Sequence, residues 1–309
     1  MDFIKVDDMT SPHHGDEIAA LRGAIRKLDR PMGLSLSPGP ADINKASELA
    51  CNAQMWRISG DFWDHWPQVK AQFDLFSNSA PYAKPDSWPD GDMIAIGRIG
   101  IRAERGDERM TNFTRDERHT LMTLWCIGRS PLILGAHLPA NDAITTSLIT
   151  NDEVIAVNQK AGNSRRLFLR GEQAAWTSEA LGSNSKYQGV FNTGDKRAQD
   201  VGVNWADIGM PDVCEVRDPW ARKSMGTMRK GNAFHVPRMV RDCSRSRRAT
   251  ETWLWANHEK YILSNCIRGT DVRRRHRPNT GEPSGGSAQG HGRRLGESGH
   301  GVAVSPLRQ

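Results

Sequence analysis

The first half of the chain alternates short strands with helices, and this pattern constrains the fold more than any other feature. Residues 3–7 place Ile4 and Val6 on one face and Lys5 and Asp7 on the other, as a half-buried strand does. Further strands are predicted at residues 33–37, 55–58, 93–96 and 131–134, and helices at 16–28, 41–51, 66–76, 115–128 and 153–158. Alternation of this kind indicates β/α units around a parallel sheet, with fewer strands than the eight of a closed barrel.

After about residue 159 the pattern changes to short extended runs separated by turn residues. Such runs occupy residues 166–169, 174–177, 186–191 and 213–218, with a clear turn at 192–195. We therefore predict an α/β domain over residues 1–159 and a small all-β domain over residues 160–237. Residues 238–309 lose periodicity and become rich in Arg, Gly, Ser and His, so we expect a disordered basic tail.

The charge of the chain lies mostly in that tail. The formal charge is +6, but residues 238–309 hold 14 Lys and Arg against 6 Asp and Glu, which leaves 28 against 30 in the rest. No basic stripe with interleaved aromatics runs through residues 1–237, so we expect no nucleic-acid partner. No apolar run approaches 18 residues and the start lacks a signal-peptide pattern, so we expect no membrane partner. The compartment and the oligomeric state stay open.

No metal or organic cofactor is expected. The five cysteines are odd in number and lack metal-ligand spacing, so they predict neither a disulfide framework nor a zinc site. His13, His14 and Asp16 could suggest a metal site, but adjacent histidines point in different directions and the segment reads as a helix start.

Asp7 is the first candidate for catalysis. It stands at the carboxyl end of a predicted parallel strand, where α/β barrels place catalytic groups. Lys5 points the same way, and an ammonium near Asp7 favours the ionised form that a nucleophile needs. An aspartate that only caps the following turn would fit the same pattern.

Asp61 is the second candidate, because it follows another predicted strand closely. Two carboxylates with separate roles are the minimum set for glycoside hydrolysis, and a retaining enzyme holds them about 5 Å apart. Arg57 could position a hydroxyl or the acid, although Arg57 and Asp61 could also form a plain surface ion pair. In the segment WPDGDM at residues 88–93, aspartates could bind sugar hydroxyls and the indole could stack on the sugar ring. The same residues could also form an ordinary tight turn.

Taken in order, four segments resemble the successive motifs of the α-galactosidases of glycoside hydrolase family 27. They are DFIKVDD at residues 2–8, MWRISGD at 55–61, WPDGDM at 88–93 and SPLILG at 130–135. The likeness continues into the second domain and covers about three-quarters of the chain. It implies an incomplete (β/α)8 TIM barrel, about strands 4 to 8, followed by a small antiparallel β-sandwich.

The resemblance also implies roles for individual residues. Asp7 matches the nucleophile and Asp61 the acid/base of a double displacement on a terminal α-D-galactosyl residue. Lys5, Arg57, Asp92 and Met93 match positions that line the sugar pocket. Ser37 stands where many family members carry a glutamate that reads the 2-hydroxyl, and serine there is similar to the α-N-acetylgalactosaminidase version.

The resemblance leaves the activity and the specificity open. The first three strands of the family's barrel have no counterpart here, so we expect the 309-residue chain alone to have little or no activity. A non-enzymatic sugar-binding remnant is the rival interpretation. Within the enzyme class, α-N-acetylgalactosaminidase and β-L-arabinopyranosidase specificities are the alternatives.

Overall fold

The structure is a computed structural model that describes residues 2–236 and 262–268. Both stretches belong to one compact unit, Met1–Asp271. Most of the predicted disordered tail, residues 238–309, lies outside the described residues.

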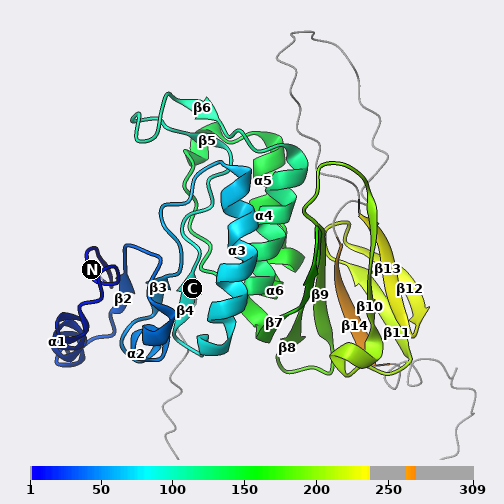
Figure 1. The fold of residues 1–309 in the computed structure, drawn as a ribbon, viewed down its shortest axis with the longest axis horizontal. Helices are drawn as coiled ribbons and strands as arrows, with labels where there is room; N and C mark the ends of the chain where they lie inside the picture. Colours follow the sequence, from blue (N-terminus) through cyan, green and yellow to red (C-terminus); the bar gives the residue numbers. More distant parts are fainter. Residues whose placement is uncertain (1, 237–261, 269–309) are drawn as a thin grey trace, which may run out of the picture. The chain divides into compact units, whose positions relative to one another are not determined.

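A four-stranded parallel sheet forms the first part of the fold (Figure 1). Its strands, in spatial order, are β1 (Phe3–Val6), β2 (Gly33–Leu36), β3 (Met55–Arg57) and β4 (Trp88–Asp90). The predicted strands at 33–37 and 55–58 are confirmed. Those at 93–96 and 131–134 are wrong, because these segments meet only at one parallel bridge, Ile94 with Leu134. The fourth strand ends earlier because Asp92 takes a left-handed backbone conformation, φ 76°, that no extended strand allows.

Helices connect and cover these strands. They are α1 (Gly15–Arg26), α2 (Ala46–Asn52), α3 (Trp66–Ser79), α4 (Arg115–Gly128), α5 (Ala143–Ile149) and α6 (Asp152–Lys160), with 3-10 turns at Ile43–Lys45, Ala80–Tyr82, Leu138–Ala140 and Trp205–Ile208. Helix α4 begins in a capping box, in which Thr114 and Glu117 each bond the other's backbone N–H. Most of α4 is buried. The short helix α5 was missed by the sequence analysis.

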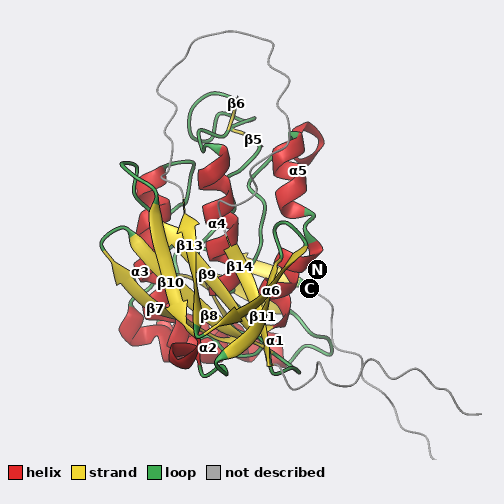
Figure 2. Cartoon of the chain, turned by 90° about the vertical axis from the view of Figure 1, so that its right-hand side faces the viewer, coloured by secondary structure: helices red, strands yellow, loops and turns green. Residues whose placement is uncertain are grey.

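The second part of the fold is antiparallel (Figure 2). A six-stranded sheet has the order β12 (Lys223–Arg229), β11 (Val213–Asp218), β14 (Ile262–Arg268), β9 (Lys186–Asn192), β8 (Gln173–Ala180) and β7 (Ala161–Arg170). A separate pair joins β10 (Gln199–Asn204) to β13 (Gly231–Val236). Val190 and Cys214 of the sheet share one hydrophobic core with Val201 and Phe234 of the pair.

Strand β14 corrects the prediction of a disordered tail for seven of its residues. Residues 262–268 pair with β11 on one side and β9 on the other. The backbone hydrogen bonds of two neighbouring strands define this position, and they depend little on side-chain periodicity. The boundaries at residues 159 and 237 stay predictions.

The two parts share a continuous hydrophobic core. Phe73 of α3 meets Phe191 of β9 edge to face, with ring centroids 5.0 Å apart. Trp176 of β8 belongs to the same buried cluster as Trp125 of α4. The β-domain therefore covers the helices on the outer side of the parallel sheet.

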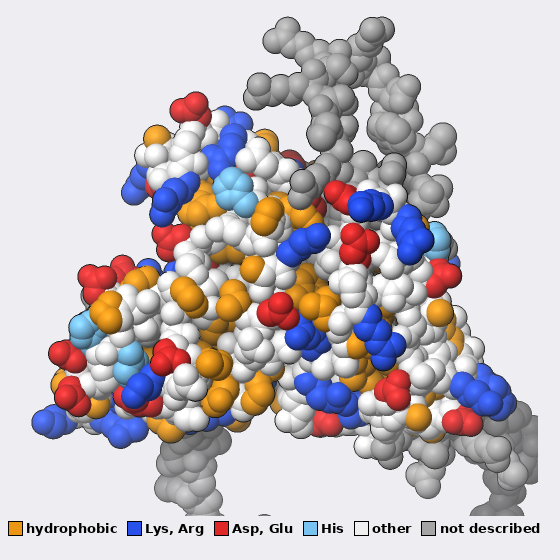
Figure 3. All heavy atoms as spheres, viewed as in Figure 1, with side chains coloured by type: hydrophobic (Ala, Val, Ile, Leu, Met, Phe, Trp, Pro, Cys, Tyr) orange, Lys and Arg blue, Asp and Glu red, His pale blue; other side chains and the backbone are white. Residues whose placement is uncertain are grey.

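A short hairpin extends from the first part, made of β5 (Arg98–Ile99) and β6 (Arg109–Met110). On the face shown in Figure 3, Lys and Arg side chains are interspersed with Asp and Glu. Among the described residues, no helix has the length and apolarity that crossing a membrane requires.

Candidate active site

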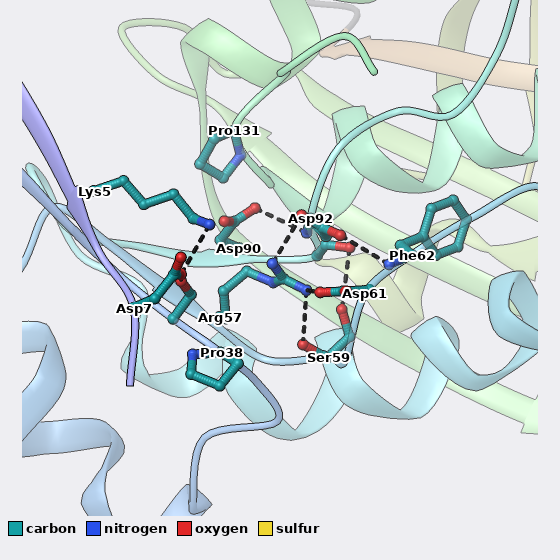
Figure 4. Close-up of polar contacts among 12 residues, drawn as sticks. Lys5, Asp7, Pro38, Arg57, Ser59, Asp61, Phe62, Asp90, Asp92 and Pro131 are labelled. Carbon is teal, nitrogen blue, oxygen red and sulfur yellow. Dashed lines mark hydrogen bonds and ion pairs between the residues drawn. The ribbon is translucent and has the colours of Figure 1, made fainter. Parts of the chain in front are cut away.

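Polar side chains gather where the four parallel strands end (Figure 4). Asp7 follows β1, Ser37 follows β2, Asp61 lies beyond β3 and Asp92 beyond β4. Because the strands are parallel and adjacent, their carboxyl ends lie at one edge of the sheet. The sequence thus places its two candidate catalytic acids at the same edge.

Asp7 is held as a carboxylate by its neighbours. The Ser37 hydroxyl donates a hydrogen bond to Asp7 Oδ1, and Lys5 Nζ lies 3.0 Å from the same oxygen. The Ser37 hydrogen bond, followed by that of Lys5, lowers the pKa of Asp7 below its usual value. The Asp7 side chain remains 67% exposed and borders solvent.

Arg57 is the cation at the centre of the site. Its side chain is only 3% exposed, and its Nη1 lies 2.9 Å from Asp92 Oδ1. Its Nη2 lies 3.5 Å from Asp61 Oδ1 and donates to the Ser59 carbonyl at 3.2 Å. A surface ion pair is therefore excluded for Arg57, which is buried and fixed by several partners.

Arg57 links the two candidate acids. Its charge contributes to the lowered pKa of Asp7, and its guanidinium pairs with Asp61. Figure 4 draws Lys5 and Asp7 on one side of Arg57 and Asp61 on the other. Arg57 thus pairs directly with Asp61 and acts on Asp7 through its charge.

Asp92 is locked in place by hydrogen bonds on both its backbone and its side chain. Its N–H donates to Asp90 Oδ1 at 2.9 Å, and its Oδ2 accepts from the Phe62 backbone N–H at 2.8 Å. Trp125 Nε1 donates to its carbonyl at 3.1 Å. A left-handed non-glycine residue costs energy and persists only where its surroundings determine it, which is common at functional sites.

Asp90 belongs to the site but was not singled out from the sequence. It is buried next to Arg57 and Asp92, and desolvation raises its pKa to about 6. In the sequence, Asp90 is marked by its place in the WPDGDM segment, but the pocket-lining role was assigned to the second acid of that segment, Asp92. We assign it to the support of Asp92.

Met93, predicted to line the pocket, is partly buried and packs on Gly135. A Cβ added to Gly135 would lie 2.5 Å from Met93 Sδ, so a side chain at position 135 would force Met93 to shift. Met93 thus packs against the backbone of the SPLILG segment.

Arg105 is a second residue that the sequence did not reveal. It lies in the β5–β6 hairpin, and its Nη2 donates to Asp61 Oδ2 at 3.0 Å. Asp61 and Arg105 are 55% and 60% exposed, so this pair borders solvent, unlike the buried Arg57. His13, considered as a metal ligand, lies 3.1 Å from Glu48 Oε1 through its Nε2.

A parallel β/α sheet with acids at its strand ends, followed by an antiparallel β-domain, matches the architecture of part of a barrel-type glycoside hydrolase. A family model described as alpha galactosidase A matches residues 16–160, and one described as alpha galactosidase C-terminal beta sandwich domain matches residues 170–239. The chain belongs to glycoside hydrolase family 27, the α-galactosidase family. Its first part is part of a (β/α)8 TIM barrel, and its second part is the β-sandwich.

Individual relatives agree with this assignment. Alpha-galactosidase 2 of Arabidopsis thaliana is 31% identical over 179 residues, which are 57% of this chain and 42% of that protein. The alpha-galactosidase of Oryza sativa subsp. japonica is 26% identical over 77% of this chain and 55% of its own length. A family 27 β-L-arabinopyranosidase from Geobacillus stearothermophilus superposes with a TM-score of 0.77 at 35% identity, over 87% of this chain and 58% of that one. The chain spans about half the length of the curated relatives it matches.

Proposed function

We propose that this chain carries the catalytic carboxylates of a retaining α-galactosidase, which releases terminal α-D-galactosyl residues from oligosaccharides or glycoconjugates. The observation that carries the proposal is the pair of acids around buried Arg57, at the strand ends of a family 27 barrel. The names of the α-galactosidase relatives support the choice of galactose.

The geometry suggests a division of labour between the acids. Asp7, with its lowered pKa, attacks the anomeric carbon as a carboxylate and forms a galactosyl-enzyme ester. Asp61 gives its proton to the departing oxygen, then takes one from the water that cleaves the ester. Lys5, Arg57, Asp92 and Met93 hold the sugar.

Ser37 acts differently from a simple sugar contact. Its side chain is buried, and its hydroxyl is bonded to Asp7 in the free chain. We propose that Ser37 orients the nucleophile Asp7 and does not contact the sugar directly.

Azide rescue in a complete barrel that contains this chain tests the two roles separately. We expect Asp7→Asn to abolish hydrolysis of p-nitrophenyl α-D-galactoside, and added azide with Asp7→Gly to yield the β-galactosyl azide by direct displacement. Asp61→Gly with azide should yield the α-galactosyl azide, because azide then attacks the galactosyl-enzyme ester. Proton NMR of the products distinguishes the anomers, and the reversed pattern would exchange the roles of the two acids.

The isolated 309-residue chain should turn over slowly. Its described residues provide four paired parallel strands, and β1 forms one end of that sheet. We propose that the sugar pocket needs further strands to close. Turnover by the pure chain at the rate of a full-length family member, abolished by Asp7→Asn, would show that the chain is sufficient.

β-L-Arabinopyranosidase activity is the second candidate, supported by the Geobacillus stearothermophilus structure at 35% identity. The two sugars share their ring stereochemistry and differ by the hydroxymethyl group of galactose. Comparing kcat/KM for p-nitrophenyl α-D-galactoside and p-nitrophenyl β-L-arabinopyranoside decides between them. A chain that binds these sugars without any turnover in a complete barrel would instead be a non-enzymatic remnant.

A further inference from the structure

A cleft of about 460 Å³ opens beside Asp61. Its walls are formed by Gly60, Asp61, Trp63, His65, Gln68 and Arg105. Asp7 and Lys5 are not among them, so the proposed nucleophile does not line the cleft. Its volume falls in the range of roughly 300–1,000 Å³ that is usual for small-molecule sites.

One wall of the cleft is held rigid by Gln68. Its Nε2 donates to the Asp61 carbonyl at 3.0 Å, and its Oε1 accepts from the Trp63 backbone N–H at 2.8 Å. Both ends of this one amide are therefore engaged, and they fix Trp63 relative to Asp61. Such support from neighbouring side chains is what a preorganised site requires.

Arg105, which also lines the cleft, is connected to the same loop through the ion pair of Arg109 with buried Asp64. Asp64, whose side chain is fully buried, accepts from Arg109 Nη2 at 2.6 Å and from the Asn112 backbone N–H at 2.8 Å. Arg109 Nη1 also donates to the Arg105 carbonyl at 3.0 Å. Arg109 thus fixes the position of the hairpin, and with it Arg105, at the edge of the cleft.

The chemistry of the walls suits a sugar ring. An indole such as Trp63 offers a flat apolar face with a polar edge, on which the C–H face of a pyranose can lie. Arg105 adds a fork of N–H donors and His65 an imidazole, both able to bond hydroxyl groups. An acid that protonates the departing oxygen must touch the group bonded to that oxygen, and Asp61 forms part of the cleft.

We propose that this cleft is the leaving-group subsite and that it takes a pyranose sugar, stacked on Trp63 and hydrogen-bonded by Arg105. This inference rests on the proposed role of Asp61. It makes Trp63 and Arg105 specificity-determining residues, which favour substrates whose galactosyl group is attached to a second sugar. Gln68 and Arg109 are positioning residues for them.

Binding to the full 309-residue chain tests the proposal without requiring turnover. The indole N–H signal of Trp63 is assigned in a ¹H–¹⁵N spectrum by its loss in Trp63→Phe. D-glucose, the leaving group of melibiose, is then titrated, with the acyclic polyol mannitol as the matched probe. We expect glucose to shift the Trp63 signal and mannitol to leave it unchanged, because only a ring presents a flat face.

Two variants measure the contributions of the walls. Trp63→Ala should weaken glucose binding roughly tenfold, the value of one aromatic contact. Arg105→Ala should weaken it several-fold, while Arg102→Ala, the same charge change in the same exposed hairpin, should leave it unchanged. A Trp63 signal that glucose does not move, or equal binding by the Arg105 and Arg102 variants, would overturn the proposal.

The outcome is separable from that of the proposed function. Glucose binding at Trp63, together with a complete barrel that hydrolyses no α-galactoside or β-L-arabinopyranoside, would count against the proposed function alone. Hydrolysis with an unmoved Trp63 signal would count against the cleft alone.

Discussion

Strand β1 and the pair β3–β4 support acidic side chains by different means. Asp7, after β1, is exposed and is held by Lys5 and Ser37 at the end of the sheet. Arg57, at the end of β3, is buried and pairs with both Asp92 and Asp61, which lie beyond the ends of β4 and β3. Asp7, the proposed nucleophile, is therefore held by a half-exposed lysine and a serine, whereas Asp61, the proposed acid/base, is paired with a buried arginine.

The largest expected effect comes from removing Arg57. Arg57→Ala leaves Asp92 and buried Asp90 without their cation, and breaking a buried pair in this way costs about 3–5 kcal/mol of unfolding free energy. Urea denaturation followed by circular dichroism measures it. Arg105→Ala is the control, because an exposed pair contributes about 0–1 kcal/mol. Equal losses in the two variants would remove the distinction between the buried ion pairs of Arg57 and the exposed ion pair of Arg105.

The second prediction concerns the pH dependence of stability at the two ends. The folded pKa of Asp90 is raised to about 6, so the folded state binds more protons than the unfolded state between about pH 4 and 6. The contribution of Asp90 to the free energy of unfolding therefore falls as pH rises through this window. Between pH 4 and pH 7, the free energy of unfolding of Asp90→Asn should rise by on the order of 2–3 kcal/mol relative to that of the parent chain.

Asp7 should show the opposite sign. Its folded pKa is lowered, so its stabilisation is present above the unfolded pKa and is lost as pH falls through the folded value. The free energy of unfolding of Asp7→Asn should therefore fall relative to that of the parent chain as pH rises to 5 from values at which Asp7 is protonated in both states. Urea midpoints at a series of pH values measure both variants, and parallel curves for the two would contradict the assignment.

The smallest effect is expected at Ser37. Ser37→Ala removes the largest cause of the lowered pKa of Asp7, so that pKa should rise toward its usual value. Titration of the Asp7 carboxyl carbon by NMR measures the change. Thr10→Ala, which removes a hydroxyl bonded to the Pro38 carbonyl rather than to an acid, should leave the titration of Asp7 unchanged.

The sequence predicted those elements whose signals are local. Helix α4 was predicted at its observed bounds, 115–128, since no glycine or proline interrupts residues 115–127 and apolar residues recur at helical spacing from Leu121 onward. Strand β4 was misplaced because it contains Pro89, and proline counts against a strand in sequence patterns. Strand β14 was missed because its place depends on distant partners, β9 and β11.

The candidate site follows the same rule. Asp7 and Asp61 could be found because each follows a recognisable strand within a recognisable motif. Arg105 could not, because it contacts Asp61 across 44 residues of chain from a hairpin without periodicity. The burial of Arg57 was equally hidden, since the sequence gives its spacing to Asp61 but not its exposure.

The position of β14 has a consequence for the order in which the chain folds. In the six-stranded sheet, β14 separates the β11–β12 hairpin from the β7–β8–β9 meander. The latest of these strands to leave the ribosome is therefore an interior one, and the two subassemblies cannot join until residue 268 has been synthesised. Contacts that span so many residues form slowly, and the nascent β-domain waits with two open edges that a chaperone or a neighbouring chain can reach.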